Sequence, residues 1–172
     1  MIPRVLIACI GNIFLGDDAF GCEVARRLSA RPLPAGARLV DFGIRGFDLA
    51  LALLDEAVDV AILVDAVARG EPPGTLYLIE PEWAEPAGPG HVEAAPIDTH
   101  ALDPVQVLRL VLTLGGRPKR VLLVGCEPTP LDDDDDPPNE LSAPVQEAVA
   151  EAVRMIESLV VQVREGREVG AA

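Results

Sequence analysis

Residues 5–21 read VLIACIGNIFLGDDAFG, and this stretch decides how the chain folds. Its unbroken apolar run ends at Gly11 and Asn12, which is the pattern of a strand covered on both faces. Beyond the turn, apolar residues recur at helical spacing as far as Ser29. The acidic pair Asp17 and Asp18 falls where that helix would begin, because the positive end of a helix dipole favours negative charge. The stretch therefore predicts a strand, a glycine turn and a helix that starts at the carboxylates.

The alternation of apolar runs and helical patterns continues along the chain. Further strands are expected over 37–42, 58–65 and 120–125, and further helices over 47–56, 104–114 and 142–163. Such alternation predicts parallel strands joined by right-handed crossovers. Residues 74–79 follow the strand before them too soon for a crossover, so they are expected to run antiparallel at an edge. The predicted fold class is α/β, a three-layer α/β/α sandwich with a mixed five-stranded sheet, mostly parallel with one antiparallel strand.

Length and composition narrow the class of protein. The 172 residues suit a single domain over 1–163, followed by a flexible tail over 164–172. A net charge of −14 leaves no basic stripe for nucleic acid. No apolar run approaches the roughly 20 residues of a membrane span. The three cysteines show no C-x-x-C spacing, so we expect neither a disulfide framework nor a zinc site, and a cytoplasmic location.

Three separated residues offer the ligands of a divalent-metal site. Asp65 closes the most apolar strand, where ionised carboxylates are seldom buried without a partner. The carboxyl ends of parallel strands meet at one edge of a sheet, which brings Asp65 towards the pair Asp17 and Asp18. His100 ends a long Pro- and Gly-containing connection. Two carboxylates and one imidazole suit a divalent ion with coordination positions left open.

Each of these residues also has a simpler interpretation. Asp17 and Asp18 are typical of helix starts, and only one of two adjacent side chains can point into a given pocket, so either is the candidate ligand. His100 could instead cap the helix that follows, and Cys126 could be either a nucleophile paired with His100 or a buried thiol. The aspartate run 132–136 is typical of a solvated loop.

Several segments together resemble the hydrogenase maturation proteases. Residues 11–21 are similar to the N-terminal signature of that family, and residues 41–46 to its second glycine turn. The remaining matches are the strand end at 63–66, the histidine loop at 98–100, and the last strand and helix entry at 124–128 and 141–145. The resemblance covers nearly the full chain, and the order and spacing of the segments are specific.

The resemblance implies a cytoplasmic endopeptidase that removes a C-terminal extension from the precursor of the large subunit of a nickel–iron hydrogenase. Nickel already inserted in the precursor would be the recognition mark, so the substrate supplies the metal, although another divalent ion could bind in vitro. Carried over by position, the metal-contacting and catalytic residues are Asp18, Asp65 and His100. Asp41, beside the second turn, is a candidate for positioning the substrate.

The sequence departs from the family pattern at Ala19, where glycine is frequent, and at Ile44 and Arg45 in the second turn. These departures concern the choice of substrate more than the chemistry.

Two alternatives remain open at this point. A phosphoacceptor receiver-like domain also gathers acids at strand ends, but it requires a lysine where Cys126 stands. A nickel-dependent binding module would recognise the same precursor without cutting it. The oligomeric state is not indicated by the sequence.

Overall fold

The computed structural model describes residues 2–81, 104–131 and 138–169, so His91, His100 and the aspartate run 132–136 lie outside the described residues. Five strands form one sheet in the order β2-β1-β3-β5-β4. Their bounds are β1 Val5–Ile10, β2 Ala37–Gly43, β3 Val60–Ala66, β4 Leu76–Ile79 and β5 Val121–Cys126.

The strand directions confirm the predicted mixed sheet. β1 pairs in parallel with both β2 and β3, and β3 pairs in parallel with β5. β4 runs antiparallel to β5 and lies at the edge of the sheet, as the short connection before it predicted. Because the four longer strands are parallel, their carboxyl ends share one edge, and the turns that carry candidate site residues emerge there.

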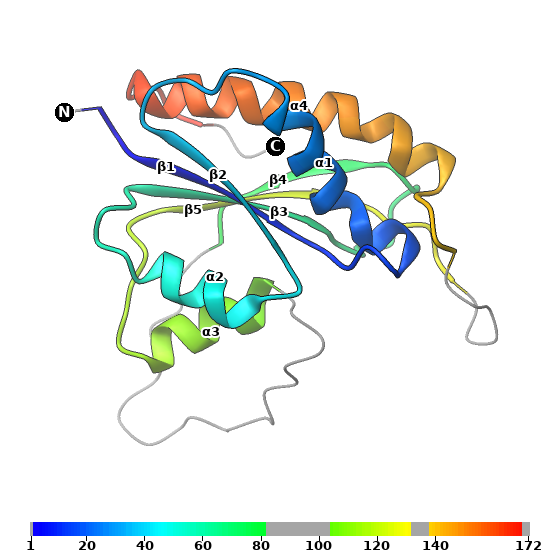
Figure 1. Ribbon diagram of the computed structural model, residues 1–172, viewed down its shortest axis with the longest axis horizontal. Coiled ribbons are helices and arrows are strands. Elements are labelled where there is room, and N and C mark those ends of the chain that lie inside the picture. Colours follow the sequence, from blue (N-terminus) through cyan, green and yellow to red (C-terminus); the bar gives the residue numbers. More distant parts are fainter. Residues whose placement is uncertain (1, 82–103, 132–137, 170–172) are drawn as a thin grey trace.

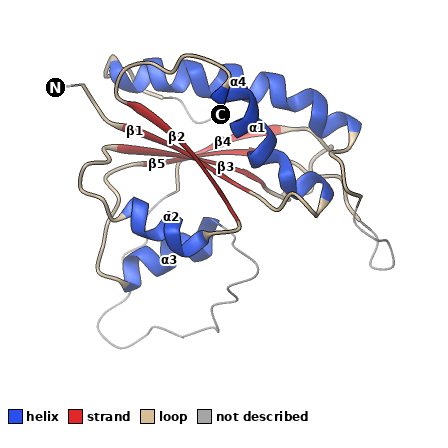
Figure 2. Cartoon of the chain, in the orientation of Figure 1, coloured by secondary structure: helices blue, strands red, loops and turns tan. Residues whose placement is uncertain are grey.

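Helices cover both faces of the sheet (Figure 1). They are α1 Phe20–Ser29, α2 Gly46–Leu53, α3 Pro104–Thr113 and α4 Ala143–Arg164. Figure 2 shows α1 and α4 on one side of the strands and α2 with α3 on the other, which is the expected three-layer arrangement. One expectation was wrong in detail. Asp17 and Asp18 precede α1 in a short 3-10 turn, η1 Gly16–Ala19, so the α-helix begins after the carboxylates.

The two layers of helix enclose two apolar cores. Alternate residues of β1 point to opposite faces, so that Ile7 packs with Val24 and Ile156 while Leu6 packs with Leu49 on the far side. Both faces of the central strands are therefore buried, which explains their continuous apolar runs. Within the segment expected to be a flexible tail, Val169 is buried against the first of these cores.

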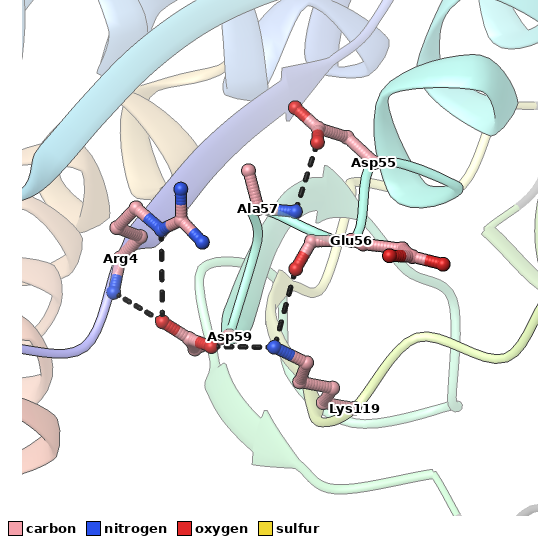
Figure 3. A network of polar contacts seen from close by, with 6 residues as sticks. All are labelled: Arg4, Asp55, Glu56, Ala57, Asp59 and Lys119. Atoms are coloured by element: carbon pink, nitrogen blue, oxygen red, sulfur yellow. Dashed lines mark hydrogen bonds and ion pairs between the residues drawn. The ribbon is translucent and has the colours of Figure 1, made fainter.

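The amino ends of the strands are tied together by a polar network (Figure 3). Asp59, just before β3, accepts a hydrogen bond of 2.8 Å from the Arg4 amide and one of 2.7 Å from the Lys119 ammonium. These bonds, that of the Arg4 amide foremost, lower the pKa of Asp59. The network joins the starts of β1, β3 and β5 and so stabilises the sheet at the amino ends of its strands. The candidate site residues lie at the opposite edge, where the parallel strands end.

Among the described residues, no helix is both long and apolar enough to cross a membrane.

Candidate active site

Asp65 occupies the carboxyl end of the central strand β3, as expected. It is only 5% exposed, and one carboxylate oxygen accepts a hydrogen bond of 2.9 Å from the amide of Ala66. In the register of β3 and β5, Asp65 is opposite Gly125. Because glycine has no side chain, β5 places none beside the carboxylate at that position. A buried acid at the end of an aliphatic strand is therefore held at the edge where parallel sheets bind ligands.

Two glycines bring η1 and α1 onto this edge. A Cβ added at Gly21 would lie 2.0 Å from the carbonyl oxygen of Ile10 and 2.6 Å from that of Val64. A Cβ at Gly11 would lie 2.2 Å from the carbonyl oxygen of Asp18. Only glycine permits these approaches. As a result η1, which carries Asp18, lies directly against β3, which carries Asp65.

The structure separates the roles of the adjacent aspartates. Asp17 is buried, and its carboxylate accepts hydrogen bonds from the Thr129 amide at 2.8 Å, the Ser142 amide at 2.6 Å and the Ser142 hydroxyl at 2.8 Å. Each carboxylate oxygen is thus already engaged within the protein. Asp17 is a structural residue, and of the pair only Asp18 has a carboxylate exposed at the surface.

Asp18 is held by the turn that precedes it. Its Oδ2 accepts a hydrogen bond of 3.0 Å from the amide of Asn12, and the side chain of Asn12 in turn accepts one of 3.0 Å from the amide of Phe14. Burial of the carboxylate against the protein raises the pKa of Asp18, although the bond from Asn12 opposes the shift. Because the free energy cost of this burial falls on the charged form, a cation beside the carboxylate would relieve it.

Asp41 and Cys22 extend the acidic edge towards β2. The Cys22 thiol lies 3.5 Å from the Asp41 carboxylate and 3.5 Å from the carbonyl oxygen of Gly11, and it can donate to both. Both residues line an open pocket of 570 Å³ between α1 and the residues that lead into α4, with Ile13 and Gln146 also in its wall. The prediction that Asp41 positions substrate stays a prediction, although its place beside this pocket suits the role.

The pKa values of two cysteines show how the acids cluster. Burial, together with the charges of Asp41, Asp18 and Asp65, raises the pKa of Cys22 to about 12. Burial likewise raises the pKa of Cys9, with Asp41 and Asp65 contributing. One thiol therefore lies within electrostatic reach of all three carboxylates. This places Asp18, Asp41 and Asp65 on one edge of the sheet, around the first turn of α1.

The sequence-predicted set is brought together in part. Asp18 and Asp65 share the carboxyl edge, whereas His100 lies outside the described residues. Within the part of the chain that the structure describes, no three His, Cys, Asp or Glu residues are close enough to hold a metal ion. Two carboxylates are too few ligands for a closed site. Their chemistry fits a cation that brings further ligands of its own.

Cys126 has the features of a core residue. It is fully buried, and burial raises the pKa of its thiol to about 12, so the reactive thiolate is suppressed at neutral pH. The alternative of Cys126 as a nucleophile finds no support in this environment.

Sequence reasoning overlooked Glu127, which follows Cys126 directly. Its buried carboxylate accepts hydrogen bonds from the amides of Arg69 and Gly70, at 2.8 and 3.0 Å, and from the Tyr77 hydroxyl. It therefore holds the loop that follows Asp65. The available signal was the same as for Asp65, an acid at the end of an aliphatic strand.

Comparison with known proteins identifies the family. A sequence model of the hydrogenase maturation proteases matches residues 22–159, a span that begins after Asp18 and contains Asp65. The hydrogenase expression/formation protein HupD of Rhodobacter capsulatus is 32% identical over 165 residues, which are 95% of this chain and 76% of that protein. HupD of Rhizobium leguminosarum bv. viciae is 31% identical, over 99% of this chain and 82% of that protein.

A solved structure agrees with these sequence relatives. The hydrogenase maturating endopeptidase HybD from E. coli superposes with a TM-score of 0.69 at 25% identity, covering 92% of this chain and 93% of that one. The shared fold and the sequence matches confirm the resemblance and favour a peptidase over a receiver-like domain. The chain belongs to the hydrogenase maturation protease family and is a peptide-bond hydrolase of that family.

Proposed function

We propose that this protein removes the C-terminal extension of the large-subunit precursor of a nickel–iron hydrogenase, after nickel insertion, and that the bound nickel is its recognition mark. The observation that supports the proposal is that η1, which carries Asp18, lies against β3, whose carboxyl end carries Asp65, so that two carboxylates, too few for a closed metal site, share one edge of the sheet. An incomplete set suits a metal that arrives already held by the substrate. The family of the chain supplies the reaction class.

In this mechanism Asp18, Asp65 and His100 complete the coordination of nickel that cysteines of the precursor already bind. Nickel is part of the substrate and is a Lewis acid. Its coordination by these residues would also hold the adjoining peptide in place. Because the acids stand on rigid elements, binding converts an encounter in solution into an oriented attack of water on the scissile bond. Asp65 is fixed by its strand and Asp18 by the Asn12 turn. All three cysteines are free thiols, which supports a reducing cytoplasm as the location.

A cleavage assay on nickel-loaded precursor tests the site. We expect Asp18→Asn, Asp65→Asn and His100→Ala each to lose at least about a hundredfold in kcat/KM, because one metal ligand is removed in each. Asp55→Asn, at the opposite edge of the sheet, and His91→Ala are the matched controls and should cleave as the wild type does. Wild-type activity in all three site variants would reject the site.

The role of nickel requires a separate comparison. The same precursor prepared without nickel should remain uncut, and mass spectrometry of the precursor before and after mixing reports the loss of its C-terminal segment directly. Equal cleavage of both preparations would show that nickel is not the recognition mark. Stable binding with no loss of mass would favour the alternative, a binding module that recognises the precursor without cutting it.

A further inference from the structure

Large apolar side chains stand exposed beside the candidate active site, in the segments that follow β1 and β2. The turn after β1 presents Phe14, which is 72% exposed, and the first turn of α2, which follows β2, presents Phe47, which is 59% exposed. Both aromatic residues are accompanied by exposed aliphatic neighbours. We call the whole set the apolar rim; it consists of Ile13, Phe14, Leu15, Ile44 and Phe47.

The two turns form one surface because their bases are hydrogen-bonded to each other. β1 and β2 are adjacent and parallel, and the amide of Gly11 donates to the carbonyl oxygen of Gly43 at 3.1 Å where both strands end. Ile13 also lines the pocket that contains Asp41. The apolar rim is therefore continuous with the acidic edge on which Asp18 lies.

The rim is held in shape although it is exposed. In the first turn, Asn12 accepts hydrogen bonds from the amides of Phe14 and Leu15. In the second, the Arg45 guanidinium donates to the carbonyl oxygens of Asp41 and Phe42, at 2.6 and 3.1 Å. A fixed surface loses little conformational entropy on binding, which is a feature of docking sites. A group of exposed apolar side chains on two neighbouring segments of an acidic protein is a feature of interaction surfaces.

We infer that the apolar rim is the surface on which the folded hydrogenase large-subunit precursor docks, through an uncharged apolar patch next to its scissile segment. The inference rests on the proposed function. A protein substrate whose peptide reaches Asp18 must bring its own surface against the turns that flank that residue. The chain carries a net charge of −14, whereas the rim residues are uncharged, and the exposed side chains of Arg45 and Asp48 beside them pair with each other at 3.5 Å, so this surface adds no net charge for a partner patch to compensate. Aromatic anchors surrounded by aliphatic residues are typical of interface hot spots.

The double variant Phe14→Ser/Phe47→Ser tests the docking surface. In cleavage of nickel-loaded precursor we expect KM to rise at least about tenfold, and kcat to stay within about twofold, because docking is lost while the acids remain. Immobilised precursor should show the same weakening of Kd. Ile2→Ser is the matched control, since Ile2 is 55% exposed but precedes β1 at the opposite edge, and it should leave both constants unchanged.

Melting temperatures of all variants should lie near that of the wild type, since the substituted side chains are exposed. If the double variant fails to fold, the two single variants carry the same test. If the folded variants keep the KM and Kd of the wild type, the inference is overturned. The proposed function would still stand in that case, provided that the wild type cleaves the precursor. If the wild type binds the precursor but does not cleave it, loss of that binding in the variants still supports the surface. Self-association of the wild type that the same substitutions abolish would assign the rim to a second copy of the chain and overturn the inference.

Discussion

The carboxylate of Asp17 is bonded to both the amide and the hydroxyl of Ser142, a residue 125 positions further along the chain. Ser142 is the N-cap of α4, so this contact joins the turn that carries Asp18 to the start of the longest helix. The contact fixes which way the acidic pair faces. Since Asp17 points inward to Ser142, Asp18 is left to face the acidic edge.

Replacement of the two aspartates should therefore affect stability differently. Asp17→Ala leaves the partly buried amides of Thr129 and Ser142 without acceptors, and an unsatisfied group costs up to about 1–3 kcal/mol. We expect a clear fall in melting temperature. Asp18→Asn should leave the melting temperature at pH 7 unchanged or slightly higher, because burial raises the pKa of Asp18 and so penalises its charged form.

Thermal denaturation of the two variants at pH 7 checks this pair, with Asp55→Asn as an exposed control. A stable Asp17→Ala protein would show that the Ser142 contact does not hold the turn. A strongly destabilised Asp18→Asn protein would assign Asp18 a structural role and weaken its place in the site.

Much of this arrangement follows from the sequence because it depends on local patterns. The unbroken apolar runs at 5–10 and 60–64 are buried on both faces, and the short connection before β4 forced the antiparallel edge. Residue patterns alone could not divide the roles of Asp17 and Asp18, because the division is set by Ser142, far away in the chain, and only the family resemblance pointed to Asp18. The contact between Cys22 and Asp41 likewise depends on how α1 packs across β1 and β2.

Gly21 should be irreplaceable for steric reasons. Alanine normally favours a helix over glycine, and Gly21 lies within α1. At this position, however, the added Cβ would lie 2.0 Å from the carbonyl oxygen of Ile10, which is backbone and cannot move aside. We expect Gly21→Ala to destabilise the fold by at least about 1–3 kcal/mol, and to reduce cleavage because α1 is pushed away from Asp65.

Urea denaturation measures the first effect and the cleavage assay the second. Ser29→Ala, at the exposed end of the same helix, is the control and should change stability little. Unchanged stability of Gly21→Ala would contradict the close packing of α1 on the strand ends.

Glu127 should make the stability of the protein depend on acid pH. The Tyr77 hydroxyl and then the backbone amides of Arg69 and Gly70 lower the pKa of Glu127 by their hydrogen bonds. The unfolded chain binds a proton more readily, so this stabilisation is present above the ordinary glutamate pKa of about 4.3 and is lost as the pH falls through the folded value. As the pH falls below about 4.3, the melting temperature should therefore fall as well.

Glu127→Gln should lower the melting temperature at pH 7 and flatten its dependence on pH within that range, since the titrating group is gone. Burial and the charge of Glu127 raise the pKa of Tyr77 to about 12, so the contribution of Tyr77 persists below pH 10 and is lost as the pH rises through about 12. Tyr77→Phe is the companion variant: it should abolish the alkaline component and also reduce the acid one, because the Tyr77 hydroxyl is the first cause of the lowered pKa of Glu127. Identical acid profiles for the wild type and Glu127→Gln would contradict this role.

The cysteines provide a test of the acidic cluster that needs no substrate. Burial raises the pKa of Cys22 and of Cys126 to about 12, and it also raises that of Cys9, so all three thiols of the native protein should react slowly with iodoacetamide at pH 8. Unfolded protein should react at all three. Asp41→Asn removes the negative charge that contacts Cys22 but keeps a side-chain oxygen that can accept from the thiol, so the pKa of that thiol falls and its labelling should speed up.

Mass spectrometry of labelled peptides identifies the cysteine that reacts, and Cys22→Ser in the Asp41→Asn background should remove the accelerated site. Asp48→Asn is the control, because Asp48 is exposed on α2 and does not contact Cys22. Rapid labelling of Cys22 in the wild type would show that the carboxylates do not surround the thiol as the structure has them. Acceleration confined to Asp41→Asn would instead confirm a negative charge beside Cys22 in the wall of the pocket that both residues line, and would make Asp41 the next residue to vary in the cleavage assay.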